Sequence, residues 1–458
     1  MVVQHNMQAA NANRMLNVTT SAQSKSTEKL SSGYRINRAA DDAAGLTISE
    51  KMRKQIRGLD QASTNAQDGV SSVQTAEGAL TEVHSMLQRM NELATQAANG
   101  TNSKDSDRQA IQDEIDQLTT EIDRVSETTK FNETYLLKGE AGTKTINMKA
   151  HDAGLKGTLT DNGDGTATFV MDSLKDGDSV SIGGKTYTIG SKKADVVAKI
   201  TAAGQKFTVN GQEITTVDTY TDKDTEQKAG KYTVADAKAL VKDGATVKLG
   251  TDEYKVMTDN DANGIDDTDA SVISKDVAYG LASKELLAAN QIGDTKGSAR
   301  VADAGAKADG SFKITTGQAE VANSLSFSLH VGADADMTNK IQVNIDAMDS
   351  ASLGIKGLNV KDASGNAATY AVDAISDAIS KVSSQRSSLG AVQNRLEHTI
   401  NNLDNVVENT TTAESRIRDT DMAEEMVNYS KNNILAQAGQ SMLAQANQSN
   451  QGVLSLLQ

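Results

Sequence analysis

The chain has 458 residues and contains no Cys, Pro or Trp, and only 3% of its residues are aromatic. The absence of Cys excludes disulfides and thiolate metal sites, and the absence of Pro permits very long helices. A formal net charge of -15 argues against nucleic-acid binding, which needs a basic surface. No apolar run reaches the length of a membrane-spanning helix, about 20 residues, and no secretory signal is visible after Met1.

The first strong pattern lies between residues 59 and 97. Apolar residues recur there at steps of three and four, the spacing of one helix face. The sequence therefore predicts a helix from Ile48 to Ala98, roughly 75 Å long at 1.5 Å per residue, with a stop at Asn99-Gly100. The glycines inside it, Gly58, Gly69 and Gly78, weigh against strict continuity.

Two further helical patterns carry a single apolar stripe each. One runs from Ile111 to Val125, with Asp107 as a candidate cap, and the other from Ile375 to Val407. Helices with one apolar face must pack together to be stable, so we expect the last helix to run antiparallel to the first. The predicted fold class is mainly α: a long antiparallel helical bundle or coiled coil built from both chain ends.

The middle of the chain, residues 140–322, is rich in Gly, Thr, Asp and Lys. Val180–Ile189 reads as a hairpin turning on Gly183-Gly184, and Phe207–Ile214 as another turning on Asn210-Gly211. The stretches that begin at Asp176 and Asp243 look like one unit used twice. Short helices are expected near residues 194–200, 234–241 and 281–289. We interpret this region as an inserted, β-rich α+β region of one or two small modules.

The two ends, residues 1–40 and 415–458, are rich in Ala, Asn, Gln and Ser and carry only a sparse apolar stripe. An isolated molecule gains little from burying so few apolar groups, whereas many copies packed side by side would bury the stripe. We therefore predict ends that become ordered on polymerisation. In the C-terminal segment the polymerisation stripe comprises Ile417, Met426, Tyr429, Leu435, Met442, Leu443, Leu454 and Leu457.

No catalytic constellation, cofactor motif or zinc-ligand spacing is found among the five scattered His residues, so we predict no enzyme and no catalytic, cofactor or metal site. The segment Asp259–Asp266 has the carboxylate and amide spacing of a calcium loop, with Gly264 at the sharp turn. Position 12 of that frame is Ala270 rather than the bidentate Glu. A polar exposed turn is the favoured interpretation, and calcium binding is the alternative.

Three long stretches resemble bacterial flagellins. They are Leu30–Ser49, Leu87–Ala94 continuing to Asn132, and Ser415–Met426 continuing to Gln458. The similar regions cover about residues 1–139 and 323–458. One departure is Asn450, where many flagellins carry Pro; its absence permits a more continuous terminal helix.

The resemblance implies a structural subunit of the flagellar filament that acts in motility outside the cell. It implies three parts: residues 1–40 with 415–458 as a terminal helical inner-tube domain, 41–139 with 323–414 as a helical rod, and 140–322 as a variable surface module. The implied partners are further copies of the chain, the flagellar export apparatus, a flagellin chaperone, and hook-junction and cap proteins. Export would follow the flagellar type III pathway without a cleaved signal peptide.

Other functions were weighed against this one. A hook–filament junction protein shares helical ends of this type and is the alternative. An enzyme within the insert is disfavoured because no zinc motif is present, and a carbohydrate-binding insert is disfavoured because aromatic residues are few.

The family resemblance also implies recognition by Toll-like receptor 5. Its contact motif matches here at Gln88, Arg89, Glu92, Leu93 and residues 112–114, which end at Glu114. The competing interpretation is that Leu93 is bundle core and that Arg89 and Glu114 form a solvated charge pair.

Overall fold

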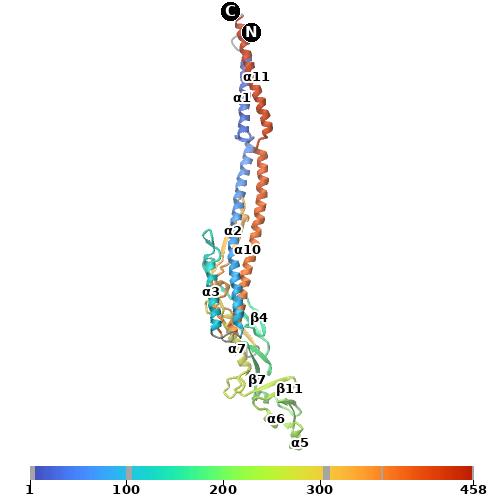
Figure 1. Ribbon diagram of the computed structural model, residues 1–458. Helices are drawn as coiled ribbons and strands as arrows, with labels where there is room; N and C mark the ends of the chain where they lie inside the picture. The colour runs from blue at the N-terminus through green and yellow to red at the C-terminus, as the bar shows by residue number, and fades with distance from the viewer. Residues whose placement is uncertain (1–5, 100–105, 303–309, 363–364, 456–458) are drawn as a thin grey trace. The chain divides into compact units, whose positions relative to one another are not determined.

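The computed structural model describes residues 6–99, 106–302, 310–362 and 365–455, with side-chain environments up to residue 449 in the last helix (Figure 1). These residues form two compact units. The first unit comprises Met1–Ser71, Ser328–Gln342 and Val392–Gln458, and the second comprises Ser72–Phe327 and Val343–Ala391. Two helices contribute to both units: α2 (Ala43–Ala98) and α10 (Asn366–Arg418).

In the first unit, α1 (Met7–Ser32) lies beside α11 (Met422–Ser455) (Figure 1). The side chain of Asn6 caps the start of α1, and Gly33 ends it in a left-handed conformation at φ 74°, which suits a residue without Cβ. The start of α2 packs antiparallel against the end of α10: Ser49 bonds Glu414, and Ser63 bonds Asp404. The predicted antiparallel pairing of the two ends is therefore confirmed.

Glycines inside α2 have a packing reason rather than a helix-breaking one. A Cβ on Gly69 would clash with the side chain of Leu329, and one on Gly58 would lie 3.0 Å from the Cβ of Ala333. The segment around β17 (Leu325–His330) and β18 (Lys340–Ile345) thus approaches the α2 backbone closely. The helix runs unbroken to Ala98, as predicted, and begins at Ala43, five residues earlier than expected.

In the second unit, α2 packs with α3 (Ser106–Thr128) and the first half of α10. The predicted seam residues are fully or nearly fully buried there: Val73, Leu80, Val83, Leu87 and Met90 on α2, Ile111, Ile115 and Ile122 on α3, and Ile375, Val382 and Leu389 on α10. Burial of one apolar stripe per helix is the physical reason for the bundle. The fold class predicted from the ends is confirmed.

The inserted region carries most of the strands. A four-stranded antiparallel sheet has the order β14-β15-β5-β4, and an eight-stranded sheet has the order β10-β9-β8-β11-β12-β7-β13 with β6 on β7. Two further two-stranded sheets pair β1 with β2 and β3 with β16. The strands are β1 Lys130–Phe131, β2 Thr134–Tyr135, β3 Glu140–Asn147, β4 Gly157–Asp161, β5 Thr166–Met171, β6 Ser179–Ile182, β7 Lys185–Lys192, β8 Lys206–Val209, β9 Gln212–Val217, β10 Lys231–Thr233, β11 Thr246–Leu249, β12 Asp252–Met257, β13 Val272–Ile273, β14 Arg300–Ala302, β15 Ser311–Thr315 and β16 Gln318–Asn323.

Helices cover these sheets in two separate cores. One core gathers Phe169, Phe312 and Tyr279 around α7, and the other gathers Phe207, Ile214 and Val247 near α4 and α6. The first core also includes Tyr370 of α10, so it joins the insert to the bundle, and the division of the insert into one module or two stays a prediction. The helices are α4 Lys193–Ala198, α5 Lys223–Lys228, α6 Val234–Leu240, α7 Lys275–Asn290 and α9 Ser350–Leu353, with a 3-10 turn at Met337–Asn339.

Both predicted hairpins are present. β6 pairs β7 across Gly183-Gly184, and β8 pairs β9 across Asn210-Gly211, with positive φ at all four turn residues. The repeated unit also recurs in structure: Val180 faces Tyr187 in the first hairpin, and Val247 faces Tyr254 in β11–β12. Among the described helices, none combines the length and apolar character needed to cross a bilayer.

Candidate functional site

The paired terminal helices α1 and α11 have almost no core of their own. Ser26 is the buried residue of α1, and Glu425 and Ala436 are the buried residues of α11 among those with described side chains. Large apolar side chains instead face solvent: Met15 is 60% exposed and Met442 also 60%. A helix pair with so little burial gains little stability from packing, because helical stability in proteins comes mostly from an apolar face buried against a neighbour.

Three of the exposed apolar side chains, Met15, Leu435 and Met442, line a groove between α1 and α11. Its volume is about 750 Å³, and it is lined by Met15, Leu16, Leu435, Gly439 and Met442 together with small and amide residues. A Cβ at Gly439 would lie 3.4 Å from Leu16 Cδ1, an ordinary van der Waals contact, so α1 and α11 pass close to each other at this point. This groove leaves Met15, Leu435 and Met442 uncovered in the first unit.

The predicted polymerisation stripe is only partly in this groove. Leu435 and Met442 line it, and Met426 is exposed elsewhere on α11. Ile417, Tyr429 and Leu443 are half-buried. Leu454 and Leu457 lie outside the residues whose side chains the structure describes.

A junction joins the points where α1 and α10 end. Arg35 N–H donates to Arg418 O at 2.6 Å, and Thr420 N–H donates to Gly33 O at 3.0 Å, which forms a short antiparallel bridge. The Arg418 guanidinium stacks 4.6 Å over the Tyr34 ring and bonds Glu50 at 3.0 Å. That hydrogen bond is the main cause of a lowered pKa of Glu50. Sequence reasoning missed this junction because its partners lie almost 400 residues apart in the chain.

A second surface centres on Arg89 of α2. Its Nε donates to Glu114 Oε1 of α3 at 2.8 Å, and its Nη1 donates to Glu92 Oε2 at 3.2 Å. The hydrogen bond to Glu114 is the main cause of a raised pKa of Arg89. The side chain of Arg89 is 50% exposed. Gln88 is exposed beside it, with Nε2 3.1 Å from His84 Nε2. The structure thus gathers Gln88, Arg89, Glu92 and Glu114 on one exposed patch, which we call the Arg89 patch.

Two residues of the motif do not belong to the Arg89 patch. Leu93 is 2% exposed and packs in the bundle core. Gln112 is 3% exposed and holds the backbone of the segment before α10: its Nε2 donates to Leu358 O, and its Oε1 accepts from Val360 N–H. A direct surface contact from Leu93 is not available in this structure.

The calcium-like loop uses its carboxylates for backbone amides. Asp266 is buried, and its oxygens accept the N–H groups of Thr258, Thr268 and Asp269. Asp259 accepts the N–H of Gly264. Within the described ranges, no three His, Cys, Asp or Glu side chains are grouped so that they could hold a metal ion. The polar-turn interpretation and the calcium alternative both stay predictions, since Asp259 Oδ1 is buried without a hydrogen-bond partner among the described residues.

Comparisons with known proteins fit the two-ended helical architecture. Residues 3–142 match the family model of the bacterial flagellin N-terminal helical region, and residues 372–457 match that of the C-terminal helical region. The sequence is 40% identical to a flagellin of Clostridium tyrobutyricum, over 98% of this chain and 100% of the relative. The chain belongs to the bacterial flagellin family.

Two further full-length relatives place the chain in the same family. A flagellin of Bacillus subtilis is 37% identical over 100% of both chains, and flagellin B of Vibrio anguillarum is 38% identical over 99% of both. As a flagellin, the chain is a structural, non-enzymatic subunit of the bacterial flagellar filament, which is extracellular. These relatives are flagellins along their whole length, so we retain flagellin over the hook–filament junction alternative.

Proposed function

We propose that α1 and α11 form the surface through which copies of this chain polymerise. The observation that carries the proposal is the uncovered apolar groove between two helices that bury almost nothing themselves. Burying a Met or Leu side chain contributes roughly 1.5 to 3 kcal/mol, so neighbouring copies are the natural source of the missing stability. The stripe residues outside the groove, such as Met426, add apolar area on the same helix.

The domain division follows from this proposal. Residues 1–40 with 415–458 form the inner-tube domain, 41–139 with 323–414 form the rod, and 140–322 form the outer surface module. The support is the pairing of β3 with β16, in which Glu140 faces Asn323 and Asn147 faces Gln318. The insert therefore leaves and re-enters the helical part through two adjacent strands.

Met442→Asp tests the assembly surface. A carboxylate placed in the groove must be desolvated when a neighbour covers it, which is costly for an unpaired charge. We expect the critical concentration for filament formation to rise at least tenfold, a change of about 1.4 kcal/mol per subunit. Sedimentation of seeded monomer measures it.

The matched control is Ser441→Asp, which adds the same charge at the adjacent exposed position outside the groove. It should assemble close to the parent. Equal critical concentrations for the two variants would remove the groove from the proposal.

The same ends are the parts we propose for contact with the flagellar export apparatus, the flagellin chaperone, and the hook-junction and cap proteins. The small cores of α1 and α11 support an unfolded passage by the type III pathway without a cleaved signal, because little packing must be undone.

We further propose that the Arg89 patch is the contact for host Toll-like receptor 5. An exposed Arg flanked by carboxylates on two helices suits a polar interface anchor, a role in which Arg is enriched. Gln88, Glu92 and Glu114 complete the patch. For Leu93 we propose no direct contact with the receptor, because its side chain is buried in the bundle core beneath the patch.

Arg89→Ala should weaken receptor binding at least tenfold while the monomer keeps its helicity. The reason is the loss of a bidentate donor at the centre of the patch. Surface plasmon resonance with the receptor ectodomain measures the affinity, and circular dichroism checks the fold.

The control is Arg124→Ala. This change removes an exposed Arg on α3 that pairs with Glu121, a residue outside the motif. It should bind like the parent. If Arg89→Ala also binds like the parent, the receptor contact does not lie at this patch.

A further inference from the structure

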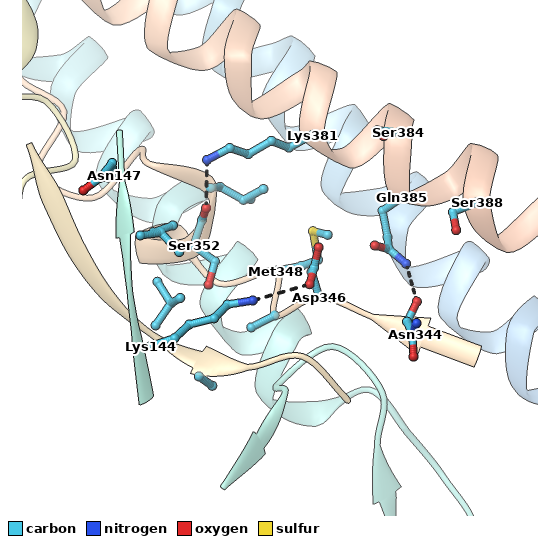
Figure 2. Close-up of a pocket in the computed structure, with 15 residues that line it drawn as sticks. Lys144, Asn147, Asn344, Asp346, Met348, Ser352, Lys381, Ser384, Gln385 and Ser388 are labelled. Atoms are coloured by element: carbon cyan, nitrogen blue, oxygen red, sulfur yellow. Dashed lines mark hydrogen bonds and ion pairs between the residues drawn. The ribbon is translucent and has the colours of Figure 1, made fainter. Parts of the chain in front are cut away.

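A cleft in the second unit shares no lining residue with the Arg89 patch. It has a volume of about 530 Å³, within the range of small-molecule sites. Its walls come from β3, β16, the segment that follows β18, α9 and α10 (Figure 2). The cleft is therefore built from the bundle and from the strand pair at which the insert begins and ends.

The lower walls of the cleft are apolar and well packed. Val321, Met348 and Leu353 are each buried, and Ile146 lines the same side. Such a surface favours an aliphatic group over water, because removing apolar area from water is favourable.

The carboxylates near the cleft already have partners. Asp346 lies 3.7 Å from Lys144 Nζ (Figure 2). It also accepts a hydrogen bond from Ser324 Oγ at 2.5 Å. Asp377, one turn before Lys381 on α10, accepts a hydrogen bond from Lys149 Nζ at 2.8 Å. Both acids are thus engaged by other cations.

Of the two lysines that line the cleft, Lys144 pairs with Asp346, whereas Lys381 has no carboxylate partner in the described part of the chain. Its Nζ reaches across the cleft and donates to the carbonyl oxygen of Ser352 at 3.2 Å (Figure 2). Within the described ranges, no carboxylate lies within 4.0 Å of this ammonium group. Desolvation by the surrounding protein lowers the pKa of Lys381, which the more distant Asp377 and Asp346 oppose. An ammonium group has three N–H donors, so two remain for another acceptor.

A nearby polar group, the hydroxyl of Ser352, has no hydrogen-bond partner among the described residues. Ser352 is 8% exposed. A buried hydroxyl without a partner is unfavourable by roughly 1 to 3 kcal/mol in general. Lys381 itself is exposed. The cleft therefore combines an ammonium group that has no carboxylate within 4.0 Å, one buried hydroxyl without a hydrogen bond among the described residues, and an aliphatic wall.

We propose that this cleft binds a small carboxylate with an aliphatic tail. The carboxylate pairs with the Lys381 ammonium group, and the tail lies along Ile146, Val321 and Met348. The cavity is sized for a free small molecule, and its one unpaired charge selects an anionic head over a neutral or cationic one.

Isothermal titration of the full-length monomer with hexanoate tests the proposal, with hexanol as the same tail without charge. For a ligand of this size we expect a Kd of about 1 mM for hexanoate and binding at least tenfold weaker for hexanol. Lys381→Met should weaken hexanoate binding at least tenfold, whereas Lys381→Arg should keep it. Lys284→Met, on the exposed face of α7 outside the cleft, is the matched control and should bind like the parent.

Ser384→Phe gives a test that leaves Lys381 in place. Ser384 is exposed on α10 at the edge of the cleft. A bulky ring there should weaken hexanoate binding at least tenfold and leave the helicity of the protein unchanged. Hexanoate binding that survives both Lys381→Met and Ser384→Phe, or that hexanol equals, would overturn the proposal. About 10 mM hexanoate is well above the expected Kd, so the absence of binding at that concentration would also overturn the proposal. If Lys381→Met then impairs filament assembly more than Lys284→Met, the occupant is a carboxylate of a neighbouring copy instead.

Discussion

A chain that ends at Ser415 is expected to remain a folded monomer and to form no filaments. The truncation removes Arg416–Gln458, which carries all of α11 and the Arg418 side of the junction. Without α11, the groove loses one wall, and α1, which buries only Ser26 in the full chain, loses the helix that packs beside it. Nothing comparable is lost from the second unit, whose buried seams lie elsewhere.

Electron microscopy of seeded protein measures this outcome, and circular dichroism supplies the control. Helicity should fall by the contribution of α1 and α11 only, and the main thermal transition should persist. Filaments of parental length from the truncated chain would show that polymerisation does not depend on the terminal pair.

Arg108→Ala is expected to destabilise the second unit by about 3 kcal/mol, more than a hundredfold in the folding equilibrium. Arg108 lies in the first turn of α3 and is 2% exposed. Its Nε donates to Ala97 O at 3.1 Å, near the end of α2, and its Nη1 donates to Asp362 O at 2.6 Å. Removing the guanidinium leaves two carbonyl groups without this donor and opens a cavity in a packed region.

Urea unfolding followed by helical circular dichroism measures the loss, and hydrogen exchange of the α3 amides localises it. Arg108→Lys separates charge from geometry, because one ammonium group cannot reproduce the planar fork. It should recover only part of the stability. A midpoint for Arg108→Ala equal to that of the parent would mean that solvent replaces both hydrogen bonds.

The helical part was predictable because its signal is local and repeated. Each turn of α2 places an apolar residue on the same face, so the seam from Leu59 to Ala97 could be read without knowing its partner. The hairpins at Gly183-Gly184 and Asn210-Gly211 were predictable for a similar reason, since the turn residues fix the geometry.

The polar interior was not predictable in the same way. Arg108 and Gln112 read as ordinary residues of an exposed helix face, and each has one acceptor, Asp362 O or Leu358 O, that lies about 250 residues away in sequence. Burial of such side chains depends on carbonyl and amide groups that only the folded chain brings near. The same limit applies to Lys381, whose importance rests on the absence of a nearby carboxylate.

The Arg89 patch shows both outcomes within one motif. Residues on the outer face of α2 and α3 could be placed by their position beside the seam, and Arg89 meets Glu114 as the charge-pair interpretation expected. Leu93 lies on the seam itself, and its burial follows the core interpretation. Whether a receptor uses the patch is a separate question of chemistry, which helical periodicity does not address.

The pairing of β3 with β16 also has a consequence for the order of folding. Roughly 170 residues separate Asn147 from Gln318, and the entropy cost of closing a flexible loop grows with the logarithm of its length. If the insert folds first, it holds its two ends about as far apart as two paired strands. Closing the helical bundle then costs about 4 kcal/mol less than with an unfolded insert. A variant that weakens only the insert would therefore slow the pairing of β3 with β16, although it changes neither strand.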